Sequence, residues 1–108
     1  MQYIWQHQLL DTTHLVTTDG RRVQVIDMGR LNTDAGPDFF NAKVRIDGCM
    51  WVGNIEIHYR ASDWKRHNHH TDKAYDSVIL HIVELDDASV KRSNGEVIPQ
   101  LVMRAAPT

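Results

Sequence analysis

The residues whose types and spacing could do chemistry lie in two short stretches. Pro37-Asp38 precedes one apolar stretch, and the triplet Glu56-Ile57-His58 lies in the next. A hard divalent cation takes oxygen ligands, such as two carboxylates and a backbone carbonyl. Asp38, Glu56 and the Ile57 carbonyl would supply such a set, and a bound Mg²⁺ or Mn²⁺ would activate water and stabilise charge on a phosphate.

His58 stands two residues after Glu56, so in a strand the two side chains share a face. An imidazole that is neutral near pH 7 could orient or deprotonate the attacking water, or bind a metal directly. Asp38, Glu56 and His58 are therefore the candidate catalytic residues, with phosphodiester hydrolysis as the reaction. The simpler interpretation makes Asp38 a turn residue and places Glu56 and His58 on the solvated face of an antiparallel strand.

A second group of metal-ligating side chains lies between residues 62 and 72, where histidines occupy positions 67, 69 and 70. Imidazole and carboxylate are common ligands of zinc and related metals. His67 could join Asp38 and Glu56 as a metal ligand. It could also form a transition-metal site with Asp38 and His58, which makes zinc the alternative to magnesium or manganese.

His69, His70 and His81 are predicted to lie outside the site. His69 and His70 fit a polar surface loop that is rich in histidine. His81 lies inside the apolar run 78–83, where a lone histidine is usually a core residue with a satisfied hydrogen bond. The single cysteine, Cys49, excludes a structural zinc finger, because such a site needs cysteine pairs.

A hairpin must bring the two chemical stretches together. The dipeptide Asp47-Gly48 is typical of a hairpin turn, and it separates a strand predicted at 39–46 from one predicted at 51–59. If these strands pair antiparallel, the start of the first lies beside the end of the second. Asp38 then reaches the same end of the hairpin as the Glu-x-His triplet.

The rest of the sequence is predicted to be rich in strands. Residues 2–10 are expected to form a short helix, and residues 62–76 an irregular or briefly helical segment in which Thr71 caps a turn. Asp19-Gly20 and Asn94-Gly95 are further hairpin signals. The other predicted strands are 15–17, 23–26, 78–83 and 97–103. This pattern predicts a β-rich α+β fold, a mixed sheet built from hairpins around a buried strand at 78–83, with an all-β sandwich as the alternative.

Composition sets the broad class of protein. A chain of 108 residues is long enough for one domain with a single core. The formal net charge of −2 argues against a dedicated polyanion binder, so nucleic acid is a partner that the charge does not indicate. The sequence has neither an apolar run of membrane-span length nor a signal-peptide pattern, so no membrane association and a cytoplasmic location are expected.

Four segments taken together resemble an uncharacterised bacterial family, a domain of unknown function. They are NTDAGPDFFNA at 32–42, WVGNIEIH at 51–58, ASDW at 61–64, and the Asp, Tyr-Asp and VILH positions between 72 and 81. Members of that family are typically several hundred residues long, so the resemblance implies that residues 1–108 are a single domain matching its N-terminal portion. It implies no activity.

This resemblance supports a non-catalytic alternative. The domain would then be a structural or interaction part of a larger protein. It would pack against a C-terminal region or pair with a second copy through its edge strands.

A shorter resemblance, carried by Pro37-Asp38 and Glu56-Ile57-His58, is to the PD-(D/E)XK nuclease superfamily. It implies a restriction-endonuclease-like core and magnesium-dependent cleavage of nucleic acid. The sequence departs from that pattern at position 58, where His replaces the usual Lys. The predicted first helix also offers Gln6 and Gln8 where many members carry a carboxylate.

Overall fold

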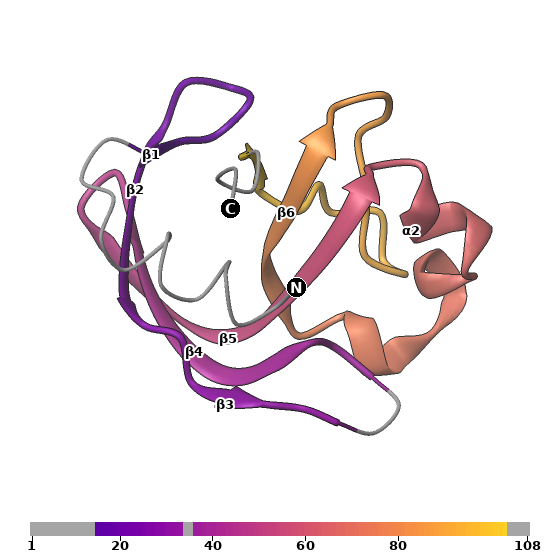
Figure 1. The fold of residues 1–108 in the computed structure, drawn as a ribbon, viewed down its shortest axis with the longest axis horizontal. Coiled ribbons are helices and arrows are strands. Elements are labelled where there is room, and N and C mark those ends of the chain that lie inside the picture. The colour runs from indigo at the N-terminus through magenta and orange to yellow at the C-terminus, as the bar shows by residue number, and fades with distance from the viewer. Residues whose placement is uncertain (1–14, 34–35, 104–108) are drawn as a thin grey trace, which may run out of the picture.

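One mixed sheet dominates the computed structural model, which describes residues 15–33 and 36–103 (Figure 1). Within those residues the sheet has seven strands in the order β1-β2-β4-β5-β6-β7, with β3 paired to β4. The strands are β1 Leu15–Val16, β2 Arg22–Asp27, β3 Arg30–Leu31, β4 Phe39–Ile46, β5 Cys49–Arg60, β6 Val78–Leu85 and β7 Gln100–Val102. The helix predicted at residues 2–10 lies outside the described residues. No helix in the described part is long and apolar enough to cross a membrane.

The first two predicted hairpins are confirmed. β1 pairs antiparallel with β2 across Asp19-Gly20, and β4 pairs antiparallel with β5 across Asp47-Gly48. Asp47 and Gly48 have φ of 48° and 83°, which is the backbone that a type I′ turn requires. The β4 register shifts between Phe39 and Ala42, so this long hairpin bends as it approaches the Asp38 end.

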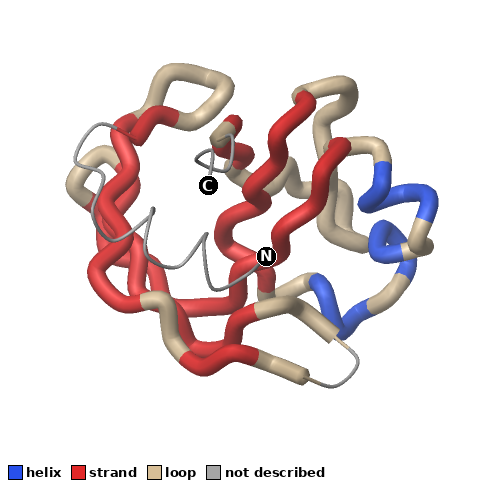
Figure 2. Tube along the Cα trace, viewed as in Figure 1, coloured by secondary structure: helices blue, strands red, loops and turns tan. Residues whose placement is uncertain are grey.

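The sheet curves until it is nearly closed, like a barrel (Figures 1 and 2). β5, β6 and β7 run parallel to one another, an arrangement that hairpins alone cannot make. The two ends of the sheet meet where Thr17 bridges Leu101 and Thr18 N donates to the Gln100 carbonyl at 2.8 Å. The sandwich alternative is wrong, because a single sheet holds all the strands of the described residues.

The parallel β5–β6 pair needs a crossover, and residues 61–77 supply it. This segment contains the helix α2 Asp63–Arg66 and two 3-10 turns, η1 His69–Thr71 and η2 Lys73–Tyr75. The prediction of a briefly helical segment is confirmed, but the predicted cap is off by one residue. Asp72 caps η2, and its carboxylate accepts a hydrogen bond from Ala74 N at 2.9 Å.

Two clusters of buried side chains hold these layers together. The larger lies within the curved sheet and includes Phe39, Val44, Ile55 and Leu80. The smaller lies under the crossover and consists of Trp64, Tyr75, Val78, Val90 and Ile98. The strand predicted at 78–83 is buried on both faces, as expected, because Leu80 faces the core within the sheet while His81, on the other face, meets Trp64 under the crossover.

The last predicted strand is shorter than expected. Asn94-Gly95 turns the backbone so that Lys91 bridges Val97, but residues 97–99 do not continue into the sheet. β7 begins only at Gln100, directly after Pro99, and proline lacks the N–H that a ladder needs. Gln100 consequently enters the sheet beside β6, at the level of His81.

Candidate metal centre

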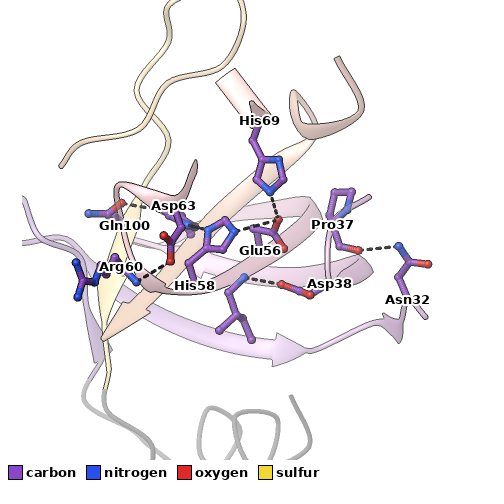
Figure 3. Close-up of polar contacts among 11 residues, drawn as sticks. Asn32, Pro37, Asp38, Glu56, His58, Arg60, Asp63, His69 and Gln100 are labelled. Atoms are coloured by element: carbon purple, nitrogen blue, oxygen red, sulfur yellow. Dashed lines mark hydrogen bonds and ion pairs between the residues drawn. The ribbon is translucent and has the colours of Figure 1, made fainter. Parts of the chain in front are cut away.

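The β4–β5 hairpin brings Asp38 and Glu56 together, as the sequence predicts. Phe39 pairs with Ile55, so Asp38 lies beside the next residues of β5. Asp38 Oδ2 accepts a hydrogen bond from Ile57 N at 2.8 Å (Figure 3), and the Asp38 side chain hydrogen-bonds that of Glu56. The carboxyl groups therefore lie close enough to share a proton or a cation.

The loop before β4 fixes the position of Asp38. Asn32 Nδ2 donates to the Pro37 carbonyl at 2.9 Å, and Asn32 N donates to the Asp38 carbonyl at 2.8 Å. Pro37 is itself buried. The two ends of the NTDAGPD segment are thus tied together, which holds the Asp38 side chain over β5.

Glu56 is buried, and its surroundings favour the protonated form. Its side chain is 5% exposed, and burial raises its pKa to about 10, with further contributions from the hydrogen bond and the charge of Asp38. Asp38 is only half-buried, but two carboxylates this close disfavour each other's ionisation. The pair is therefore expected to hold one proton.

Three histidines surround this carboxyl pair. His58 comes from β5, His67 follows α2, and His69 opens η1. Each can offer one ring nitrogen, and those three nitrogens lie within 4.8 Å of one another. His69 Nε2 is 2.9 Å from Glu56 Oε2, and His58 Nε2 is 3.8 Å from the same oxygen (Figure 3).

The inner two histidines are kept neutral. Burial lowers the pKa of His58 to about 4, and the neighbouring His69 and His67 rings lower it further through charge repulsion. Burial also lowers the pKa of His69, again with a contribution from His67. A neutral imidazole keeps the lone pair that binds a metal, so both rings are in the ligand form at pH 7.

Aromatic packing fixes His69, and His67 meets the His58 and His69 rings edge-on, with centroids 5.4 and 5.7 Å away. The His69 ring stacks on Tyr75 with centroids 3.6 Å apart, and the edge of Trp64 meets it at 5.4 Å. Burial, followed by the charge of Glu56, raises the pKa of the Tyr75 phenol to about 12. His67 is exposed, so it forms the solvent-facing side of the cluster.

His81 contacts the site from β6. Its Nε2 lies 2.8 Å from His58 Nδ1, and its Nδ1 lies 3.0 Å from Gln100 Oε1. The ring is completely buried, and burial lowers its pKa to about 3. The predicted satisfied hydrogen bond is confirmed. The expectation that His81 lies apart from the site is wrong, because its partner is His58.

The structure thus gathers Asp38, Glu56, His58 and His67 at one end of the hairpin. It also brings in His69 and His81, which the sequence alone does not assign to the site. His69 was expected to be a solvated loop residue, but η1 turns it inward and Tyr75 covers it. His70 lies outside the cluster. The spacing of the three histidines alone does not indicate His69, because the segment forms a 3-10 turn and does not alternate as a strand does.

The donor set decides which metal fits. Imidazole nitrogens suit zinc, copper, iron and nickel, whereas carboxylate, carbonyl and water oxygens suit magnesium and manganese. With three imidazoles in the cluster, a transition metal fits better than the magnesium first expected. Ligand atoms of a tetrahedral zinc ion at roughly 2.0–2.1 Å stand about 3.3 Å apart. Small rotations, chiefly of His67, would therefore complete such a site.

Comparison with known proteins gives no support to the resemblance to PD-(D/E)XK nucleases. No curated protein and no solved structure matches the chain. A protein-family model does match it, over residues 1–107. The chain therefore belongs to the family described as "Protein of unknown function (DUF2851)".

Proposed function

We propose that this domain binds a transition metal ion, with zinc the first choice, through His58, His67 and His69. The observation that carries the proposal is the convergence of three ring nitrogens within 4.8 Å of one another, beside the carboxyl pair of Asp38 and the buried Glu56. Three protein ligands leave a fourth tetrahedral position for water or substrate, an arrangement typical of catalytic zinc sites. The site is therefore suited to hydrolysis.

Glu56 would assist the ion. Its Oε2 lies 2.9 Å from His69 Nε2 and 3.8 Å from His58 Nε2, distances close to the spacing of about 3.3 Å between ligands of a tetrahedral zinc ion. A cation at this position would displace the proton that Glu56 shares with Asp38, because ligating carboxylates are deprotonated. The freed carboxylate could then bind the ion or accept a proton from water.

Metal-dependent stabilisation tests the proposal. Zinc added to metal-free protein is expected to raise the melting temperature, because the ligands converge only in the folded state. An ion at 100 times its dissociation constant adds about 2.7 kcal/mol to the free energy of unfolding. Scanning calorimetry measures the shift, and elemental analysis should find one ion per chain. The same excess of magnesium should have a much smaller effect. Equal shifts with both ions, or none with zinc, would contradict a histidine site.

Phosphodiester hydrolysis is the finer proposal for the reaction. It is favoured by the Asp38–Glu56 pair, which adds oxygen ligands and a base beside the histidines. Asp38→Ala is expected to abolish metal-dependent cleavage of single- or double-stranded nucleic acid, measured by gel assay with zinc, manganese or magnesium. If the wild-type protein cleaves no substrate with any of these ions, the enzyme proposal fails. What remains is a metal-binding interaction domain.

A further inference from the structure

The hydrogen-bond network behind His58 begins at Gln100, on β7. Gln100 Nε2 donates to Asp86 Oδ1 at 2.7 Å and to the Ala88 carbonyl at 2.9 Å. A carbonyl oxygen can only accept, so the amide nitrogen of Gln100 must face the loop at 86–88. Gln100 Oε1 therefore faces the opposite way, toward His81.

The Gln100 amide determines which nitrogen of His81 carries hydrogen. Gln100 Oε1 lies 3.0 Å from His81 Nδ1, and an amide oxygen can only accept, so His81 Nδ1 must donate. The His81 ring is completely buried, and its two nitrogens meet an uncharged amide and another imidazole, so the ring is neutral. Since a neutral imidazole has one N–H, His81 Nε2 is bare and must accept.

His81 in turn determines the tautomer of His58. His58 Nδ1 lies 2.8 Å from the bare His81 Nε2, so His58 Nδ1 must carry the hydrogen. The His58 side chain is only 9% exposed, and burial disfavours a charged imidazole, so the His58 ring is also neutral. Its lone pair is therefore on Nε2, the nitrogen that lies 3.8 Å from Glu56 Oε2.

We infer that His81 and Gln100 are positioning residues, which hold His58 in the Nδ1–H tautomer and present its bare Nε2 to the ion. Metal-ligating histidines usually donate their other ring N–H to a carboxylate, carbonyl or water. Here the acceptor is the ring of His81, and the side-chain amide of Gln100 on β7 fixes the His81 tautomer. This inference rests on the proposed function only where it states that His58 Nε2 binds the ion. The tautomers of His58 and His81 are properties of the metal-free protein.

The same network is poorly suited to carrying protons. A proton moving from His58 to His81 would next have to reach Gln100, and an amide oxygen does not take up a proton near neutral pH. The network therefore fixes an orientation and a tautomer, without offering a path to the exposed Asp86. The parallel pairing of β5, β6 and β7 makes this network possible, because Glu56 pairs with His81 and His81 pairs with Gln100.

Nitrogen-15 NMR of the metal-free protein at pH 7 tests the inference directly, because protonated and bare ring nitrogens have different chemical shifts. The expected spectrum has His58 and His81 each protonated at Nδ1 and bare at Nε2. A wild-type His58 that carries its proton on Nε2 would overturn the inference without any variant.

Gln100→Leu then tests the origin of the tautomer. Without the amide acceptor, His58 and His81 are expected to populate the other tautomer, and the zinc affinity should fall by roughly 10–100-fold, as for other outer partners of ligating histidines. Leu101→Ala is the matched control. Leu101 is the adjacent buried residue of β7, so its truncation should destabilise the fold and leave the His58 tautomer unchanged.

The outcomes separate this inference from the proposed function. If the wild-type tautomer is as expected but zinc does not bind, the positioning network stands and the metal proposal fails. If zinc binds and Gln100→Leu changes neither the tautomer nor the affinity, the metal proposal stands and the positioning role is overturned.

Discussion

Replacing His67 by alanine is expected to lower the zinc affinity by at least about 100-fold, because a lost ligand should cost more than the 10–100-fold typical of outer partners. His67 is exposed, so the change should alter the free energy of unfolding by no more than about 0.5 kcal/mol. Competition with a chromophoric chelator measures the affinity. Exposure makes His67 a cleaner choice than His69, whose ring also stacks on Tyr75.

His70→Ala is the control for this prediction. His70 lies on the same crossover, in η1, but outside the three-histidine cluster. Its replacement should leave the zinc affinity unchanged, whereas a general effect of histidine content would weaken both variants alike. Full affinity in His67→Ala would show that His67 is not a ligand.

The free energy of unfolding of the metal-free protein is expected to peak near pH 6.5 and to fall on both sides. On the acid side, burial lowers the pKa of His58 to about 4 and that of His81 to about 3, from an ordinary value of 6.5. The unfolded chain then binds protons that the folded protein does not, so stability is lost as the pH falls from 6.5 through these values. His69 adds to this loss in the same direction.

On the alkaline side Glu56 has the opposite effect. Its pKa is raised from 4.5 to about 10, so the folded protein holds a proton that the unfolded chain has released. Its contribution to stability is complete below pH 4.5 and is lost as the pH rises through about 10. One proton bound only by the folded state costs about 1.4 kcal/mol per pH unit. Between pH 7 and 9, stability should therefore fall by about 3 kcal/mol.

Urea unfolding at fixed pH in the presence of a chelator measures this profile. Glu56→Gln is the control, because glutamine has nearly the same shape, can donate to Asp38 and does not titrate. In this variant the free energy of unfolding should no longer fall above pH 7. The loss of stability at acid pH, which the histidines cause, should remain. A parent protein equally stable at pH 7 and pH 9 would mean that Glu56 ionises in the folded state at its ordinary pKa.

The sequence was most informative where one local signal determines one local structure. Asp47-Gly48 specified the turn, and the alternation on either side of it specified the register that joins Asp38 to Glu56. The apolar run at 78–83 specified a buried strand. In each case a few neighbouring residues hold the information, because turn geometry and side-chain alternation are local properties.

Contacts that depend on non-local pairing could not be predicted in this way. His81 meets His58 only because β6 runs parallel to β5 through a crossover, and the sequence does not state that register. His69 faces inward because Tyr75, six residues later, stacks on it. Nothing in the His-rich segment alone distinguishes His69 from His70, which belongs to the same 3-10 turn and lies outside the cluster.

The place where the curved sheet closes also bears on the histidine cluster. The backbone carbonyl of Gln100 accepts a hydrogen bond from Thr18 N, while the Gln100 side chain holds His81. One residue thus joins the first hairpin to the network behind His58. The closure of the sheet and the orientation of His81 therefore depend on the same residue. A substitution that displaces the Gln100 backbone is expected to disturb both at once.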